Sequence, residues 1–230
     1  MKIGILQTGH APDEVLDSLG DYDAMFARLL DGHGFDFVTY NVVDMAFPAG
    51  PDACDGWLVT GSKHGAYEDH AFIPPLEDLI RAIRDTGRPM IGVCFGHQII
   101  AQALGGRVIK FPGGWSVGRQ DYDYGGTRVG INAWHQDQVV DLPPEAEVIA
   151  SSDFCAYAGL VYGDLIWTIQ PHPEFGSDMI EALATHRAPG VVPDGLIDAA
   201  RATLDAPTGR MGVAADMAAF LKRGAACATG

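Results

Sequence analysis

The sequence predicts an α/β fold in which an open, mostly parallel sheet is flanked by helices. Short apolar runs bounded by turn residues alternate with segments of helical period, as in chains that build such sheets. One run, residues 89–93, is continuously apolar, which is typical of a central parallel strand covered on both faces. The 230 residues suit one well-packed domain, and 47% of them are hydrophobic against 20% charged, as in ordinary globular proteins.

The first part of the chain supplies the elements of the parallel sheet. Strands are expected at residues 2–7, 35–40, 56–60 and 89–93. Apolar residues at helical spacing, followed by glycines that can end a helix, predict helices around residues 22–30, 76–83 and 99–104.

From Arg107 to about Gln170 the pattern changes to short strand-like runs with many glycines. The runs lie at residues 107–111, 127–134, 146–151 and 165–170. They predict an antiparallel or mixed extension of the sheet, with boundaries fixed only to within a few residues. The last part is rich in alanine and predicts helices at residues 178–187, 195–204 and 215–224. No repeat or low-complexity linker interrupts the chain.

Charge and cysteine content restrict the partners. The 30 acidic and 15 basic side chains give a net charge of -15 that is spread along the chain, which argues against nucleic acid and against an anionic membrane surface. The N-terminus does not resemble a signal peptide, and no apolar run approaches the roughly 20 residues of a membrane span. A cytoplasmic location is therefore expected. Four cysteines without CxxC spacing suggest neither a disulfide framework nor a metal site, and nothing suggests a cofactor.

Cys94 stands in a glycine frame, Gly92-Val93-Cys94-Phe95-Gly96, directly after the central strand. This is the G-x-nucleophile-x-G form of a nucleophile elbow, with cysteine in place of serine. Glycines remove the side chains that would clash in so tight a turn, and the following helix N-terminus favours a thiolate. A lone cysteine in such a turn is also compatible with a small buried hydrophobe. The frame alone leaves the two interpretations balanced.

A second motif, "TIQPHPEFG" at residues 168–176, offers a base for such a nucleophile. His172 and Glu174 are two residues apart after an apolar strand, and in extended chain such residues point to the same side. The flanking prolines are expected to hold this backbone extended. A nucleophilic cysteine needs a base, and the base needs an orienting group, so the pair favours a functional Cys94.

The segments "GVCFGHQIIAQALGG" and "QPHPEF" together resemble the class I glutamine amidotransferases. Enzymes of this family release ammonia from the glutamine side chain with a Cys-His-Glu triad. The resemblance implies a flavodoxin-like fold, with Cys94 as nucleophile, His172 as general base and later acid, and Glu174 as orienting carboxylate. We expect one domain over residues 1–230, with a shared core of about 1–187 and a helical C-terminal extension of about 188–230.

Acyl transfer also needs N–H donors for the developing oxyanion. The elbow itself offers the backbone N–H of Phe95. The family commonly has Ser-Gly-Gly-Pro after a neighbouring strand, where this chain has Thr60-Gly61-Ser62-Lys63. The resemblance therefore implies Ser62 N–H as the second donor and Gly61 as part of the substrate site. Ser62 carries a Cβ where glycine is usual, and an ordinary turn remains the alternative.

Further substrate contacts are implied by two segments. Gln98 lies one helical turn after Cys94, and in the family this glutamine contacts the substrate. "AWHQDQV" at residues 133–139 matches the region that receives the amino-acid end of the substrate, which makes Trp134, His135 and Asp137 candidates. Exposed polar turn residues are the alternative for this segment.

A pair of histidines, His64 and His70, lies near Asp69. Their spacing matches no known metal site, so we interpret them as polar loop residues.

The resemblance predicts cleavage of a γ-glutamyl amide through a Cys94 thioester, with ammonia or an amine released. A small-molecule substrate, glutamine or a γ-glutamyl compound, is expected. The sequence contains no P-loop or ATP-binding segment that would indicate a synthase domain. The protein is therefore expected either to act with a separate ammonia-accepting synthase or to act alone as a γ-glutamyl peptidase on glutathione-like compounds. The GMP-synthase-like branch that includes γ-glutamyl peptidases is the nearer match. A non-catalytic stress or binding module of the DJ-1/PfpI type is the alternative of another class, and the His-x-Glu pair argues against it.

Overall fold

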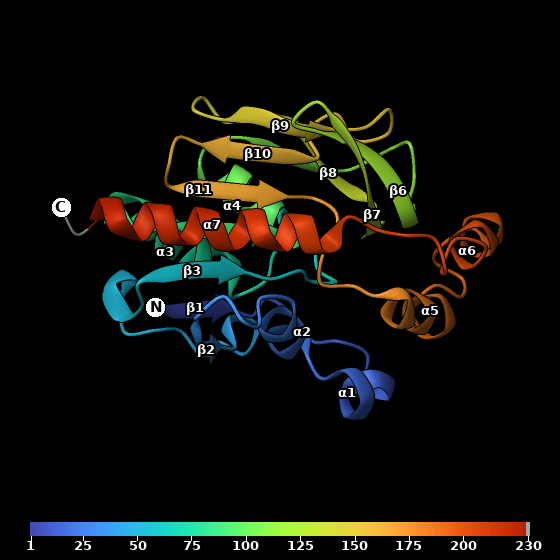
Figure 1. Cartoon of the computed structure of the whole chain (residues 1–230), viewed down its shortest axis with the longest axis horizontal. Helices are drawn as coiled ribbons and strands as arrows, with labels where there is room; N and C mark the ends of the chain where they lie inside the picture. The colour runs from blue at the N-terminus through green and yellow to red at the C-terminus, as the bar shows by residue number, and fades with distance from the viewer. Residues whose placement is uncertain (229–230) are drawn as a thin grey trace.

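The computed structural model describes the backbone of residues 1–228 and the side chains of residues 1–225. A nine-stranded sheet runs through the molecule in the order β2-β1-β3-β4-β11-β10-β9-β6-β7, and β5 and β8 form a separate two-stranded ribbon (Figure 1). Helices cover the sheet on both faces, which confirms the predicted fold class.

The parallel half of the sheet contains the four strands predicted for it and a fifth, β11, whose run at residues 165–170 was expected in the extension. Its members are β2 (Asp36–Tyr40), β1 (Lys2–Leu6), β3 (Gly56–Val59), β4 (Met90–Val93) and β11 (Ile166–Ile169). Each pairs with its neighbour in parallel, and β4 lies between β3 and β11. All four residues of β4 are buried, as expected of a central strand.

The antiparallel half confirms the predicted extension and corrects its membership. It consists of β10 (Gly159–Tyr162), β9 (Glu147–Ser151), β6 (Ser116–Tyr124) and β7 (Thr127–His135). The run that begins at Arg107 is not part of it, because β5 (Arg107–Lys110) pairs instead with β8 (Asp137–Asp141). Sequence analysis missed β6, β8 and β10. Polar residues obscure the strand pattern of β6, which the Gly125-Gly126 turn joins to β7.

Two of the helices, α2 and α7, cover one face of the sheet, and two others, α3 and α4, cover the other face. The bounds of the helices are α1 (Asp13–Leu19), α2 (Tyr22–Leu29), α3 (Ile73–Asp85), α4 (Phe95–Ala103), α5 (Ser177–His186), α6 (Asp194–Arg201) and α7 (Arg210–Ala228), with short 3-10 turns η1 (Val42–Asp44) and η2 (Pro51–Ala53). Apolar side chains of α2 and α7 belong to the core on one face, and those of α3 and α4 to the core on the other.

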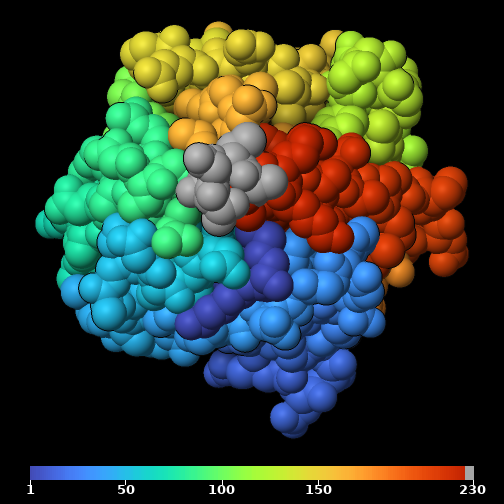
Figure 2. All heavy atoms as spheres, turned by 60° about the vertical axis from the view of Figure 1, so that its left-hand side comes forward, coloured from blue at the N-terminus to red at the C-terminus, as the bar shows by residue number. Residues whose placement is uncertain are grey.

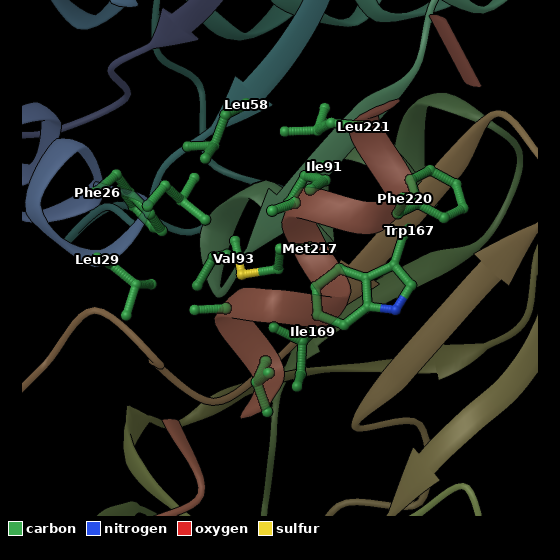
Figure 3. Close-up of a cluster of buried hydrophobic side chains, with 14 of the residues drawn as sticks. Phe26, Leu29, Leu58, Ile91, Val93, Trp167, Ile169, Met217, Phe220 and Leu221 are labelled. Carbon is green, nitrogen blue, oxygen red and sulfur yellow. The ribbon is translucent and has the colours of Figure 1, made fainter. Parts of the chain in front are cut away.

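Helix α7 is an integral part of the central packing. Its side chains Met217 and Leu221 lie against Ile91 of β4 and Ile169 of β11 in the buried cluster of Figure 3. In the space-filling view of Figure 2, the red C-terminal segment fills the space between the orange strands and the blue N-terminal part. Burial of a side chain of this size contributes about 1.5–3 kcal/mol, so α7 is a substantial source of stability.

A third apolar cluster joins α1, α5 and α6 to β6. Gly118 of β6 has a positive φ of 72°, and a Cβ there would lie 2.6 Å from the Cβ of Ala200 on α6. The missing side chain therefore allows α6 to approach the strand closely. Within the described residues, no helix combines the length and apolar character needed to cross a membrane.

Candidate active site

Cys94 occupies the turn between β4 and α4. Its φ of 54° and ψ of -106° lie outside the regions that non-glycine residues normally adopt, a strain that is characteristic of functional turns. A Cβ on Gly92 would lie 2.6 Å from the carbonyl oxygen of Gly96, and a Cβ on Gly96 would lie 2.2 Å from that of Val59. Both glycines of the frame are thus required by the close approach of β3, β4 and α4.

The thiol faces a pocket of about 340 Å³ beside the carboxyl ends of the parallel strands. Cys94 is only 6% exposed, so the pocket gives its side chain limited contact with solvent. Most of the predicted site residues line the same pocket, namely Ser62, Gln98, Trp134, His135 and His172. The carboxyl end of a parallel sheet is where open α/β folds bind ligands.

His172 and Glu174 form a buried pair beside this pocket. Nδ1 of His172 lies 2.6 Å from Oε1 of Glu174, and the two residues are 3% and 4% exposed. The ring of His172 stacks on that of Phe175 with centroids 3.9 Å apart and an interplanar angle of 4°. Packing and hydrogen bonding together fix the orientation of the imidazole.

The backbone that carries this pair differs from the prediction. We expected an extended segment, but the N–H of Phe175 donates to the carbonyl of His172 over 3.4 Å, which closes a turn. The turn, rather than strand alternation, folds the Glu174 carboxylate back onto the imidazole. The prediction of extended chain was wrong because the prolines flanking His172 are also compatible with a turn.

Electrostatics favour a charged His172. Burial by itself would lower the pKa of the imidazole, but the charges of Cys94 and Glu174 and hydrogen bonds to both outweigh burial and raise that pKa above its usual value. With Nδ1 donating to Glu174, Nε2 is the nitrogen left for Cys94. The arrangement can therefore pair a thiolate with an imidazolium.

Two residues that the sequence analysis missed hold the His172 turn in place. Arg210, the first residue of α7, donates from Nε to the carbonyl of Pro173 over 2.9 Å and from Nη2 to that of Glu174 over 3.3 Å. Asn132 of β7 donates from Nδ2 to the carbonyl of Phe175 over 3.0 Å. No local motif connects these positions, since both lie far from the turn in sequence.

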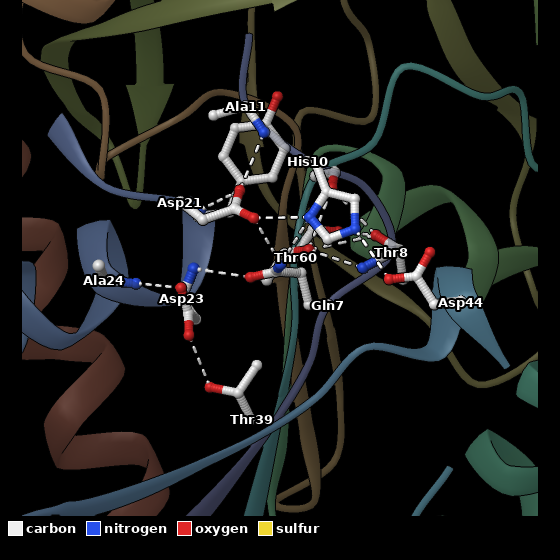
Figure 4. Close-up of polar contacts among 12 residues, drawn as sticks. Gln7, Thr8, His10, Ala11, Asp21, Asp23, Ala24, Thr39, Asp44 and Thr60 are labelled. Carbon is white, nitrogen blue, oxygen red and sulfur yellow. Dashed lines mark hydrogen bonds and ion pairs between the residues drawn. The ribbon is translucent and has the colours of Figure 1, made fainter. Parts of the chain in front are cut away.

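The loop after β3 is anchored by buried polar groups. The hydroxyl of Thr8 lies 3.0 Å from the carbonyl oxygens of both Thr60 and Gly61, and the N–H of Gly96 donates to Thr60 over 3.0 Å (Figure 4). A Cβ on Gly61 would lie 3.0 Å from Cε1 of His172, so this glycine makes room for the imidazole. Gly61 itself does not line the pocket.

Ser62 follows Gly61 and lies with Cys94 in the pocket wall. Its backbone N–H and that of Phe95 have no acceptor within the part of the chain that the structure describes. Two unpaired N–H groups beside a thiol can serve as donors to an oxyanion.

A polar network around Asp21 fixes another part of the wall. The carboxylate of Asp21 lies 2.6 Å from Nδ1 of His10 and 2.9 Å from Nε2 of Gln7, and it also accepts the N–H of Tyr22 at the start of α2 (Figure 4). The hydrogen bond to Asp21 is the main cause that raises the pKa of His10. Tyr22 is thereby held where it lines the pocket.

Gln98 and His135 both turn toward Asp137. Nε2 of Gln98 donates to the carbonyl of Asp137 over 2.9 Å and to Oε1 of Gln170 over 3.1 Å, while Nδ1 of His135 donates to the Asp137 carbonyl over 3.2 Å. Burial lowers the pKa of His135 to about 3, so its imidazole is neutral. Its Nε2 has no partner among the described residues and is available as an acceptor.

The side chain of Asp137 is a third polar group of the wall. It accepts a hydrogen bond from the hydroxyl of Tyr67 over 3.2 Å, and burial raises the pKa of its carboxyl above the usual range. Trp134, the remaining predicted contact, lines the pocket with half-buried side chain.

One side of the pocket was predicted only in part, through Trp134. It is aromatic and aliphatic, and its side chains are Tyr22, Trp115, Trp134, Phe175, Leu183 and Val191. Arg187, at the end of α5, adds a cation that has no ion-pair partner among the described residues. In a chain with a net charge of -15, such a cation is suited to bind an anionic group.

The other cysteines have different surroundings. Cys54 and Cys155 are buried, burial raises the pKa of both thiols, and neither lines the pocket. The side chain of Cys227 lies outside the described residues.

The fold and the pocket thus define an open α/β protein in which a cysteine displayed on an elbow is faced by a buried His–Glu pair. The family model for glutamine amidotransferase class-I matches residues 38–182. The chain therefore belongs to the class I glutamine amidotransferase family.

Individual relatives agree with this assignment. Gamma-glutamyl peptidase 4 of Arabidopsis thaliana is 30% identical over 203 residues, which are 81% of this chain and 81% of the relative. GMP synthase [glutamine-hydrolyzing] of Bacteroides fragilis is 30% identical over 151 residues, which are 60% of this chain but 28% of that protein. The crystal structure of a glutamine amidotransferase from Thermotoga maritima has a TM-score of 0.72 at 22% identity, with 97% of this chain and 98% of that chain covered. The last comparison supports the fold.

Proposed function

We propose that this protein hydrolyses γ-glutamyl amides through a thioester on Cys94. The observation that carries the proposal is the buried His172–Glu174 pair, whose His172 lines the same pocket as the elbow cysteine. In this assignment His172 is the general base and acid, and Glu174 orients it.

The chemistry would run in two steps. The Cys94 thiolate attacks the γ-carbonyl carbon, and the N–H groups of Ser62 and Phe95 hold the tetrahedral oxyanion. His172 gives its proton to the departing nitrogen as the C–N bond breaks, which leaves an acyl thioester and a free amine. Water, deprotonated by His172, then attacks the thioester, so that glutamate leaves and the thiolate is regenerated.

Other groups that line the pocket support a substrate larger than glutamine. Arg187 offers a positive charge, and Trp115, Trp134 and Val191 offer apolar surface. An amine with both a carboxylate and an apolar part, as in a γ-glutamyl peptide, would use all of them, whereas ammonia would use none. The relatives named gamma-glutamyl peptidase agree with this choice. Delivery of ammonia to a separate synthase is the second candidate, supported by the matched part of GMP synthase.

A substrate panel tests the proposal. Purified protein is incubated with glutamine, glutathione, other γ-glutamyl dipeptides and a neutral γ-glutamyl anilide, and free glutamate, ammonia and amine are measured. We expect turnover of γ-glutamyl peptides that the Cys94→Ala protein lacks. Turnover of glutamine alone would favour the synthase partnership, and no turnover of any compound would contradict independent hydrolysis.

Two earlier expectations stay predictions. They are the cytoplasmic location and the division of the single domain into a core of about 1–187 and an extension of about 188–230.

A further inference from the structure

Three side chains of kinds that can bind a metal, those of His64, Glu68 and His70, lie close together in the loop between β3 and α3. Nε2 of His70 lies 2.8 Å from Oε2 of Glu68, and Nδ1 of His64 lies 3.9 Å from the same oxygen. One possible ligand atom from each of the three side chains lies within 4.8 Å of the other two. The sequence analysis had placed Asp69 beside the histidines, but the structure brings Glu68 to them instead.

The spacing is close to that of a bound transition metal. Ligand atoms about 2.0–2.1 Å from a tetrahedral Zn²⁺ lie about 3.3 Å from each other. The 3.9 Å separation of His64 Nδ1 from Glu68 Oε2 would shorten by roughly 0.6 Å, and the 2.8 Å separation of His70 Nε2 from that oxygen would lengthen by about 0.5 Å. Two imidazoles and one carboxylate form a donor set that Zn²⁺ accepts, with one coordination position left open. The side chains of His64, His70 and Glu68 are 22%, 35% and 46% exposed, so an ion can reach them.

Neighbouring groups already hold the three side chains. The N–H of Gly65 donates to Oε2 of Glu68 over 3.1 Å. Both histidine rings pack on the buried ring of Phe72, with centroids 5.8 Å away for His64 and 5.9 Å away for His70. Groups that orient the ligands of a metal in this way increase its affinity.

The same loop carries a group of the candidate active site. The N–H of His64 donates to Oγ of Ser62 over 3.2 Å, and Phe72 packs on Phe95 with centroids 6.0 Å apart. His64 and Glu68 also line the pocket that contains Cys94. An ion held by these ligands would therefore lie at the pocket and restrain the Ser62 backbone.

We propose that His64 Nδ1, Glu68 and His70 Nε2 form a binding site for a divalent transition metal of the Zn²⁺ type at the edge of the reaction pocket. The site is independent of the proposed hydrolysis, because none of its three ligands takes part in the chemistry.

The test uses Co²⁺ and Zn²⁺ with the full chain in a Cys94→Ala background, which removes the thiolate as a competing ligand. We expect one equivalent of Co²⁺ to bind with d–d absorption bands and without a thiolate charge-transfer band. Zn²⁺ should displace it and raise the melting temperature. His70→Asn and the isosteric Glu68→Gln should each weaken binding at least tenfold.

His33→Asn is the matched control, since His33 lies in the distant loop between α2 and β2. It should bind the ions as the Cys94→Ala parent does. Absence of stoichiometric binding would overturn the proposal, and so would equal affinities of the His70→Asn, Glu68→Gln and His33→Asn proteins. Because binding is measured without turnover, the result does not depend on whether the protein hydrolyses γ-glutamyl amides.

Discussion

The parallel and antiparallel halves of the sheet meet at one pocket but contribute different kinds of group. The parallel strands β3, β4 and β11 end in the Ser62 loop, the Cys94 elbow and the His172 turn. The antiparallel strands β6 and β7, with α5, contribute Trp115, Trp134 and Arg187. The proposed reactive groups thus follow strands that share one direction, and the other groups of the pocket wall come from antiparallel strands and a helix.

Among the substitutions that test this comparison, Cys94→Ala is expected to have the largest effect. Loss of the proposed nucleophile should lower kcat by on the order of 10⁴-fold or more. Stability should change by less than about 1 kcal/mol, because alanine adopts the same backbone strain and leaves little empty volume. Glutamate release and thermal unfolding measure the two quantities. Retained turnover in the Cys94→Ala protein would contradict the proposal that Cys94, at the end of a parallel strand, is the nucleophile.

Gly96→Ala tests whether the elbow depends on close packing. The new Cβ would meet the carbonyl oxygen of Val59 at 2.2 Å, and backbone must move to relieve the contact. We expect a loss of more than about 3 kcal/mol in the free energy of unfolding, measured by urea denaturation.

The control for this substitution is Gly212→Ala in α7, where a Cβ meets nothing within 4 Å. Alanine should stabilise that helix by about 0.5–1 kcal/mol. Similar effects at the two positions would show that the elbow tolerates a side chain.

Glu174→Gln tests the electrostatics of the pair and is expected to lower kcat by about 10- to 100-fold. The Glu174 charge helps to raise the pKa of His172, so glutamine should lower that pKa. A His whose folded pKa is raised adds stability below its unfolded pKa and loses it as the pH rises through the folded pKa. Both the alkaline decline of kcat/KM and this loss of stability should therefore move to lower pH. A pH profile unchanged on its alkaline side would contradict the proposed role of the carboxylate.

Arg187→Met tests the antiparallel side and has the smallest expected effect. Removal of the cation should raise KM for γ-glutamyl peptides about tenfold, roughly 1.4 kcal/mol, with kcat nearly unchanged. KM for glutamine and for a neutral γ-glutamyl anilide should stay within about twofold. Arg201→Met is the control, because Arg201 pairs with Glu181 away from the pocket. An equal rise in KM for all substrates would show that Arg187 does not bind the carboxylate of the departing amine.

The parallel half could be predicted because its signals are local. The apolar run at β4 predicts a central strand, and the glycines around Cys94 predict a tight turn, without reference to distant residues. Every predicted parallel strand is present. For the antiparallel half, the sequence predicted an extension of the sheet but not which strands form it, since the polar sequence of β6 is not typical of a strand. Arg187 and Arg210 reach the site through contacts across the fold, and no pattern near either residue indicates its destination.

The contacts of Arg210 also bear on the order in which the molecule can be completed during synthesis. The turn that bears His172 is held by a residue 38 positions further along the chain, at the start of α7. The first two hundred residues contain every strand of the sheet and the proposed Cys94, His172 and Glu174 triad, but not the guanidinium that holds the turn. The turn that carries His172 therefore gains these two hydrogen bonds only when α7 has docked.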